Sequence, residues 1–212
     1  MSWQFDSWQW AVEDWLFRFD CQLPTANCRT ANLEMLPTDN NERFEHAGNV
    51  LSRFREIHTF IFDVDGVLTN GQVLVTEQGE LLRSMNVRDA QAMRMALEEG
   101  FRILILTKGK SQGVLLRLRD LGIQDIVYGI QNKLKAYEEF LDAYDLNEDG
   151  ILYMGDDIPD FEVMRRVGLP TCPADSVPEI REICKYISPL KGGEGCVRDV
   201  IEKVMKLNGV WR

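Results

Sequence analysis

The sequence has little of what histidine or cysteine chemistry requires. Only two of the 212 residues are His and no Gly-x-Ser-x-Gly segment is present, which disfavours a Ser–His nucleophile and phosphohistidine chemistry. The five Cys residues show no Cys-x-x-Cys or similar metal-binding spacing, and their odd number is typical of reduced thiols. We therefore expect the cysteines to be small buried side chains and look to the carboxylates for chemistry.

Long apolar runs and excess positive charge are also absent. No stretch of about 18 apolar residues is available to span a bilayer, and no basic segment followed by an apolar one marks a secretion signal. The net charge of −10 argues against general nucleic-acid binding, which relies on clustered Lys and Arg. These absences predict a cytoplasmic protein with neither a membrane nor a nucleic-acid partner. A phosphorylated ligand would have to be attracted by a local cation.

With 45% hydrophobic residues, the chain is long enough to bury one substantial core. We expect residues 1–48 to be an N-terminal extension of unknown role and residues 49–212 to form a single domain. Within the extension, one face of a short helix that docks on the domain or on a partner is expected to contain Trp8, Val12, Trp15 and Leu16. The alternative we favour is an extension that can be removed without loss of activity.

Beyond the extension, apolar runs alternate with helical stretches. Strands are expected at 57–62, 103–106, 126–128 and 151–154, helices at 88–99, 111–121, 132–143 and after Pro159, and a β-hairpin at 72–75 and 81–85. Apolar strands that alternate with helices predict an α/β fold, a three-layer Rossmann-like parallel sheet flanked by helices. The hairpin is a small insertion, too short to be a cap domain. Right-handed crossovers then place the loops that follow the strands along one edge of the sheet.

An acidic turn follows the first predicted strand. Asp63 and Asp65 come directly after the apolar run, and Gly66 lets the chain turn away without a Cβ clash. Side chains two residues apart on an extended backbone point the same way, so both carboxylates can reach one centre at the ligand-binding edge of the sheet. Two acids in one site repel each other unless a cation or a proton lies between them. In isolation, the same segment is equally well a simple polar turn.

A second acidic group follows strand 151–154. Asp156, Asp157 and Asp160 lie at the same predicted edge of the sheet. Carboxylate oxygens without His or Cys favour Mg²⁺ over zinc or copper. A competing interpretation is an EF-hand calcium loop, which residues 145–156 nearly match. We reject it because the second half of that loop is an apolar strand and its last residue is Asp rather than Glu.

Thr107 and Lys133 occupy positions suited to binding phosphate. Thr107 directly follows strand 103–106, where a hydroxyl and nearby helix N–H groups can hold a phosphoryl oxygen. Lys133 stands at a helix start, where the helix dipole slightly disfavours a cation and so favours a functional reason for it. Either residue can also be an ordinary surface residue. Residues 108–111 are not a P-loop, because the first glycine of that motif would be at position 104, which is Leu104.

Taken in order, these motifs resemble those of the haloacid dehalogenase superfamily of phosphotransferases over roughly residues 50–208. The resemblance implies that Asp63 is a nucleophile that forms an aspartyl-phosphate, and that Asp65 is the general acid and base. It implies that Thr107 and Lys133 stabilise charge on the transferred group. The Mg²⁺ ligands that it implies are Asp63, Asp65 and Asp156, with Asp157 and Asp160 as their supporting partners.

Within that superfamily, the chain resembles the capless 3-deoxy-D-manno-octulosonate 8-phosphate (Kdo 8-phosphate) phosphatases of lipopolysaccharide precursor synthesis. The resemblance rests further on the hairpin, on residues 86–89 and on residues 192–198. It implies a phosphorylated sugar acid as substrate and a homotetramer that pairs through the hairpin. The substrate-binding residues that it implies are Asp65, Asn86, Val87, Arg88, Asp89, Ala90, Arg94, Arg117, Lys133 and Arg198.

Two positions depart from the family pattern. Ala90 replaces the usual glycine, and residues 107–109 read Thr-Lys-Gly in place of Thr-Gly-Arg. The arginine of the second motif is therefore missing unless Lys108 or Lys110 replaces it. Two alternatives stay open: a phosphatase for a nine-carbon keto-sugar acid phosphate of the sialic-acid or KDN type, and a catalytically idle binding scaffold. Retention of both Asp63 and Asp65 argues against the scaffold.

Overall fold

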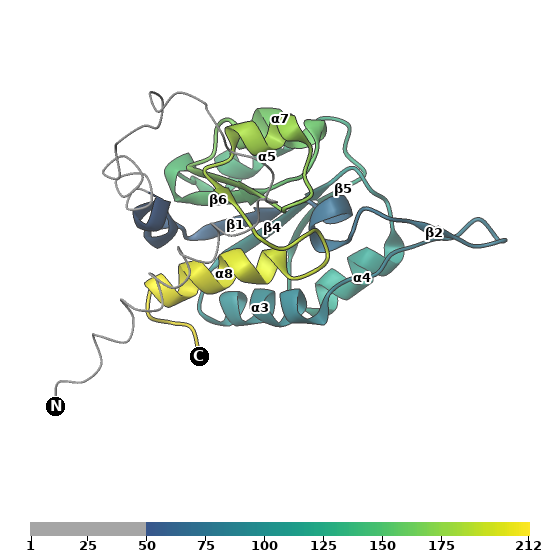
Figure 1. The fold of residues 1–212 in the computed structure, drawn as a ribbon, viewed down its shortest axis with the longest axis horizontal. Coiled ribbons are helices and arrows are strands. Elements are labelled where there is room, and N and C mark those ends of the chain that lie inside the picture. The colour runs from purple at the N-terminus through teal and green to yellow at the C-terminus, as the bar shows by residue number, and fades with distance from the viewer. Residues whose placement is uncertain (1–49) are drawn as a thin grey trace, which may run out of the picture. The chain divides into compact units, whose positions relative to one another are not determined.

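The computed structural model describes residues 50–212 (Figure 1). The proposed extension, residues 1–48, and the helix face suggested for Trp8, Val12, Trp15 and Leu16 lie outside the described residues. Residues 50–56 are helical and precede the first strand. None of the helices formed by residues 50–212 has the length and apolar character that a membrane crossing requires.

A six-stranded parallel sheet forms the centre of the described domain. Its strands lie in the order β5 (Asp125–Tyr128), β4 (Arg102–Thr107), β1 (Thr59–Phe62), β6 (Ile151–Met154), β7 (Leu169–Cys172) and β8 (Tyr186–Ile187). β1 is paired on both sides, with Phe60 opposite Ile103 of β4 and Leu152 of β6. The four strands predicted from apolar runs are confirmed. The strands β7, which contains a proline, and β8, which has two residues, lack a comparable apolar run and were not predicted.

Helices cover both faces of the sheet, which gives three layers (Figure 1). On β1, Phe60 and Phe62 belong to one buried cluster and Ile61 to the other, as the two-residue period of a strand requires. The helices on the first face are α3 (Val87–Glu98), α4 (Gln112–Asp120) and α8 (Cys196–Leu207); those on the second are α5 (Lys133–Tyr144), α6 (Phe161–Met164) and α7 (Pro178–Ile183). The predicted three-layer Rossmann-like fold is confirmed.

Side-chain caps fix where two of these helices begin. Ser111 Oγ accepts a hydrogen bond from Val114 N before α4, and Asn132 Oδ1 accepts one from Lys135 N before α5. Such caps satisfy backbone N–H groups that the first helical turn leaves unpaired. The Asn132 cap makes Lys133 the first residue of α5, next to the carboxyl edge of the sheet.

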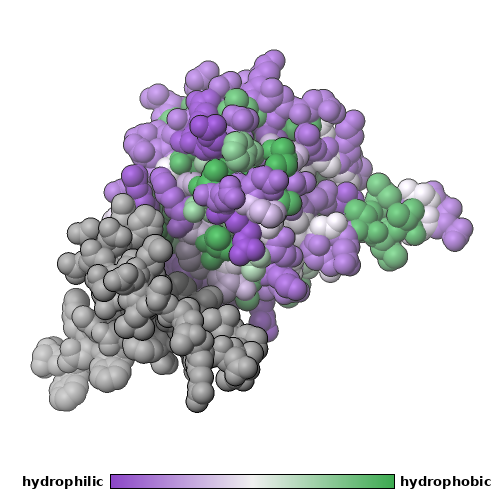
Figure 2. Space-filling model, turned by 45° about the horizontal axis from the view of Figure 1, so that its top comes forward, coloured by the Kyte–Doolittle hydropathy of each residue, from purple (hydrophilic) through white to green (hydrophobic). Residues whose placement is uncertain are grey.

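The predicted hairpin is confirmed between β1 and β4. Its strands β2 (Leu74–Val75) and β3 (Leu81–Leu82) are antiparallel, with Leu74 opposite Leu82. The hairpin extends away from the sheet (Figure 1), and Figure 2 shows its apolar residues as an exposed green group. Leu74 is 67% exposed and Val75 63%. Within the described residues, this hairpin is the only insertion between β1 and the helix that leads to β4, so no cap domain covers that edge of the sheet.

Candidate active site

Three neighbouring strands, β1, β4 and β6, end at one cleft with a volume of about 270 Å³. The cleft is lined by Asp63, Asp65, Gly71, Thr107, Lys108, Gly109, Lys133, Asp156, Asp157, Pro159 and Asp160. Every residue that was predicted to be catalytic, to bind the metal or to support its ligands therefore lies at one place. Parallel pairing causes this convergence, because the carboxyl ends of all the strands meet at the same edge.

A buried ion-pair network surrounds Lys133. Its Nζ lies 2.9 Å from Asp63 Oδ1 and 2.6 Å from Asp160 Oδ1. Lys133 is 3% exposed, Asp63 8% and Asp160 1%. Burial by itself lowers the pKa of Lys133, but the charges of Asp63 and Asp160 raise that pKa above its ordinary value. The lysine is therefore a fixed positive charge beside Asp63, as a phosphate-neutralising residue must be.

Asp63, Asp156 and Asp160 present carboxylate oxygens that lie within 4.8 Å of one another. Burial, reinforced by acidic neighbours, raises the pKa of Asp156 to about 8 and that of Asp63 to about 6. Among the described residues, Asp156 forms no ion pair. A group of oxygen ligands that carries more negative than positive charge suits a hard divalent cation. The residues present therefore fit Mg²⁺.

Asp160 has the character of a supporting residue more than of a metal ligand. Its Oδ1 accepts hydrogen bonds from Lys133 Nζ at 2.6 Å and from Tyr153 OH at 2.5 Å. Its Oδ2 accepts a longer bond of 3.3 Å from Asp156 N. These bonds occupy the carboxylate and orient Lys133, and the supporting role of Asp160 stays a prediction.

Asp65 is held differently from the other acids of the cleft. Its Oδ1 accepts a hydrogen bond from Arg83 Nε at 2.6 Å, and its Oδ2 accepts one from Arg83 Nη2 at 3.2 Å. Its oxygens do not belong to the close acidic group formed by Asp63, Asp156 and Asp160. The metal-ligand role predicted for Asp65 stays a prediction, and its pairing with Arg83 was not foreseen.

Gly66 is required by the turn that carries these acids. The turn is η1 (Val64–Leu68), and Gly66 has a φ of +88°, in the region that favours glycine. A Cβ at this position would lie 1.9 Å from Asp156 Oδ2. The glycine therefore lets the first acidic turn approach the carboxylate that follows β6.

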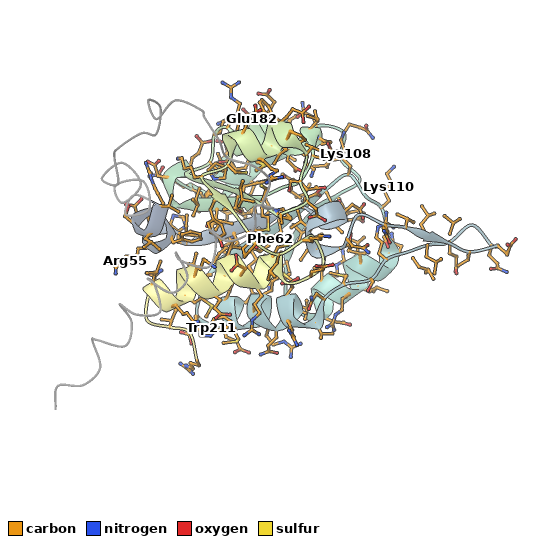
Figure 3. The ribbon with its side chains drawn as sticks, in the orientation of Figure 1. Arg55, Phe62, Lys108, Lys110, Glu182 and Trp211 are labelled. Atoms are coloured by element: carbon orange, nitrogen blue, oxygen red, sulfur yellow. The ribbon has the colours of Figure 1, made fainter. Side chains whose placement is uncertain are left out.

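The loop after β4 supplies Thr107 and Lys108 to the cleft. Thr107 is 4% exposed, and its Oγ1 accepts a hydrogen bond from Gly109 N at 3.0 Å. Lys108 lines the cleft, whereas Lys110 lines a separate hollow beside the hairpin. Figure 3 shows both lysines at the end of the sheet from which the hairpin extends. Of the two, Lys108 is the better placed to replace the missing arginine of the second motif.

Three of the predicted substrate-binding residues make internal contacts instead. Asn86 caps α3, and its side-chain amide donates to Gly193 O at 3.1 Å. Asp89 is 1% exposed, and its Oδ1 accepts a bond of 2.7 Å from Arg198 N at the start of α8. Ala90 is packed in the core. These contacts hold α3 against α8, and substrate binding by the three residues stays a prediction.

The arginines predicted to bind substrate are dispersed over the domain. Arg117 lines a hollow of about 710 Å³ beside the hairpin, and Arg88 and Arg198 line another of about 420 Å³ along α8. Arg94 and Val87 are exposed on α3. None of the five lines the acidic cleft. Within one chain, then, the cleft contains the predicted catalytic residues, including Asp65 and Lys133, but none of the arginines predicted to bind substrate.

Two residues of the site were missed by sequence reasoning. Arg83 follows two exposed leucines of the hairpin, and a lone cation in such a segment was the available signal. Tyr153 lies in the buried strand β6, where a hydroxyl group needs a partner, and that partner is Asp160. The sequence around Arg83 does not identify Asp65 as its partner, because Asp65 lies on a different element. The sequence around Tyr153 does not identify Asp160, because Asp160 lies beyond a turn.

Comparisons with known proteins agree with this geometry. No family model matches the chain. The chain is 34% identical over 163 residues to the Kdo 8-phosphate phosphatase KdsC of Escherichia coli K12, covering 77% of this chain and 87% of that protein. The structure of the Yersinia pestis Kdo 8-phosphate phosphatase matches with a TM-score of 0.75 at 33% identity, over 76% of this chain and 88% of that one. The Moraxella catarrhalis enzyme, solved with magnesium, phosphate and Kdo, matches with a TM-score of 0.73 at 28% identity, over 76% and 92%.

Proposed function

The chain belongs to the Kdo 8-phosphate phosphatase family of the haloacid dehalogenase superfamily, and from this membership we propose that it is a Mg²⁺-dependent phosphatase of a keto-sugar acid phosphate. The observation that carries the proposal is Asp63, a buried carboxylate fixed by Lys133 at 2.9 Å and grouped with Asp156. Such an arrangement suits an anionic nucleophile beside a cation site. The proposed products are the free sugar acid and phosphate.

In the proposed mechanism, Asp63 attacks phosphorus, the bond to the leaving oxygen breaks, and an aspartyl-phosphate forms. Asp65 gives a proton to the leaving oxygen and then takes one from the water that hydrolyses the intermediate. Lys133 and Thr107 stabilise charge on the equatorial phosphoryl oxygens. A Mg²⁺ held by Asp63 and Asp156 would offset the negative charge of nucleophile and phosphate. The sequence also predicts Asp65 as a ligand, and because its side chain transfers the protons, its backbone carbonyl would be the ligand atom.

The test of this mechanism is phosphate release by Asp63→Asn. The amide is nearly isosteric but cannot act as an anionic nucleophile, so we expect a loss of at least about 10³-fold. Removal of divalent cations with EDTA should also abolish turnover by the wild type, and added Mg²⁺ should restore it. Near-normal turnover by Asp63→Asn would contradict the covalent mechanism.

The substrate assignment rests on the relatives. The Moraxella catarrhalis enzyme was solved with Kdo, and we carry that ligand class over to this chain. Kdo 8-phosphate is the proposed substrate, and a nine-carbon keto-sugar acid phosphate is the alternative, because the carboxylate and phosphate groups are shared. We place the reaction in the cytoplasm.

We also propose a homotetramer that pairs through the hairpin. Leu74, Val75, Leu81 and Leu82 are each about half exposed or more, and an apolar group of this kind is typical of a protein contact. None of the arginines predicted to bind substrate lines the cleft of its own chain. In a tetramer, a neighbouring copy would bring cations to that cleft. Substrate selection would then depend on assembly, while the chemistry would not.

A further inference from the structure

We propose that Arg83 is a positioning residue that anchors one oxygen of Asp65 by a short bond and holds the other more weakly, so that the second oxygen can transfer protons; the inference rests on the proposed phosphatase function. Arg83 Nε donates to Asp65 Oδ1 at 2.6 Å, and Arg83 Nη2 donates to Oδ2 at 3.2 Å. The Arg83 side chain is 10% exposed and that of Asp65 38%. A guanidinium that bonds both oxygens fixes the plane of a carboxylate as well as its position.

The two hydrogen bonds from Arg83 to Asp65 differ in length, and this difference indicates a separate role for each carboxylate oxygen. The shorter bond anchors Oδ1. Oδ2 has the longer bond and faces the loop after β4, since it lies 3.3 Å from where a Cβ on Gly109 would be. Gly109 lines the cleft. Oδ2 is therefore the oxygen that gives a proton to the leaving group and takes one from water, while Oδ1 keeps its bond to Arg83 in both steps.

Arg83 also connects the hairpin to the site. It directly follows β3, and its Nη1 donates to Leu81 O at 3.2 Å, which holds the guanidinium against its own strand. The other side chains of β2 and β3 are exposed. A displacement of the hairpin would therefore displace the anchor of Asp65. Misplacing a catalytic group by about 1 Å can cost on the order of 10²-fold in rate.

The test is a series of substituted phenyl phosphates, which share one ring and carry no carboxylate for an arginine to bind. A p-nitrophenolate ion leaves without being protonated, whereas more basic phenolates need the proton that Asp65 supplies. In Arg83→Gln, we expect kcat/KM to fall about threefold or less for p-nitrophenyl phosphate and about tenfold to 10²-fold for phenyl phosphate. Asp65→Asn should show the same trend more steeply, Arg83→Lys should lie between, and exposed Arg119→Gln should match the wild type.

A purely structural role for Arg83 would lower kcat/KM by the same factor for every leaving group. That uniform loss, or no loss, would overturn the proposal. Thermal unfolding shows whether Arg83→Gln folds; if it does not, Arg83→Lys carries the same comparison with the same two outcomes. Failure of the proposed function is distinguishable, because the wild type would then release no phosphate or Asp63→Asn would match it.

Discussion

The acidic cleft and the predicted recognition arginines are organised in opposite ways. The cleft gathers side chains from the ends of three strands and from the start of α5 around a buried lysine. Arg117 lies beside the hairpin, Arg88 and Arg198 lie along α8, and Arg94 is exposed on α3. The parallel sheet of one chain is therefore sufficient to bring the predicted catalytic residues together. The proposed recognition of a sugar acid would need groups that, in one chain, lie away from this cleft.

Removal of the buried cation of the cleft should cause the greatest loss of stability and activity. Lys133→Met removes the cation between Asp63 and Asp160. The Lys133 Nζ lies 2.9 Å from the Asp63 carboxylate and 2.6 Å from that of Asp160. Breaking a buried ion pair should lower the free energy of unfolding by about 3–5 kcal/mol, and losing a positive charge at the phosphate should cost about 10²- to 10³-fold in kcat. Urea unfolding in EDTA and phosphate release measure the two effects.

The matched control is Lys135→Met, on the same helix but with a 75% exposed side chain. Its ion pair with Glu139 is at the surface, so its loss should change stability by less than about 1 kcal/mol. If Lys133→Met were as stable and as active as Lys135→Met, the buried network would have no part in the reaction.

A substitution among the predicted recognition arginines should lower activity only toward substrates that carry a carboxylate. Arg117→Ala removes a candidate partner of the substrate carboxylate. We expect kcat/KM for Kdo 8-phosphate to fall about 10- to 150-fold, which corresponds to a loss of about 1.5–3 kcal/mol of transition-state binding free energy. p-Nitrophenyl phosphate, which has no carboxylate, should be hydrolysed at the wild-type rate. Arg119→Ala, an exposed arginine of the same helix, is the control. Equal losses for both substrates would show that Arg117 supports the fold instead of selecting the substrate.

A substitution in the hairpin should change the stability of the domain least but should change the oligomeric state. Leu74→Glu puts a charge on the exposed hairpin, where it should change the free energy of unfolding by no more than about 0.5 kcal/mol. Light scattering should show the wild type at four times the 24.4 kDa chain mass and this variant at a smaller mass. Leu116→Glu, on α4 and 61% exposed, should leave the assembly intact. A wild type seen only at the mass of one chain would refute the tetramer.

The meeting of the acidic residues at one cleft could be predicted from the sequence because its signals are local. Asp63 and Asp156 each follow an apolar strand within two residues, and parallel strands end at one edge. Strand periodicity also specified the fold, since Phe60 and Phe62 face one layer and Ile61 the other. These inferences needed no knowledge of contacts between distant residues.

The parts that could not be predicted depend on such distant contacts. Arg83 meets Asp65 because the hairpin returns to the first acidic turn, and no spacing along the chain encodes that return. Asp89, whose binding of substrate stays a prediction, accepts a hydrogen bond from Arg198 N, on an element more than a hundred residues later. Packing between α3 and α8 decides the direction of that carboxylate, and a sequence pattern does not record it.

The most direct test of the proposed function compares kcat/KM for Kdo 8-phosphate with kcat/KM for glucose 6-phosphate in the presence of Mg²⁺. Both are phosphate esters of a primary hydroxyl, so the demand on Asp63, Asp65 and Lys133 is similar, and the comparison isolates recognition of the sugar acid. We predict a higher value for Kdo 8-phosphate. Equal values would contradict the sugar-acid assignment and would leave the phosphatase chemistry standing.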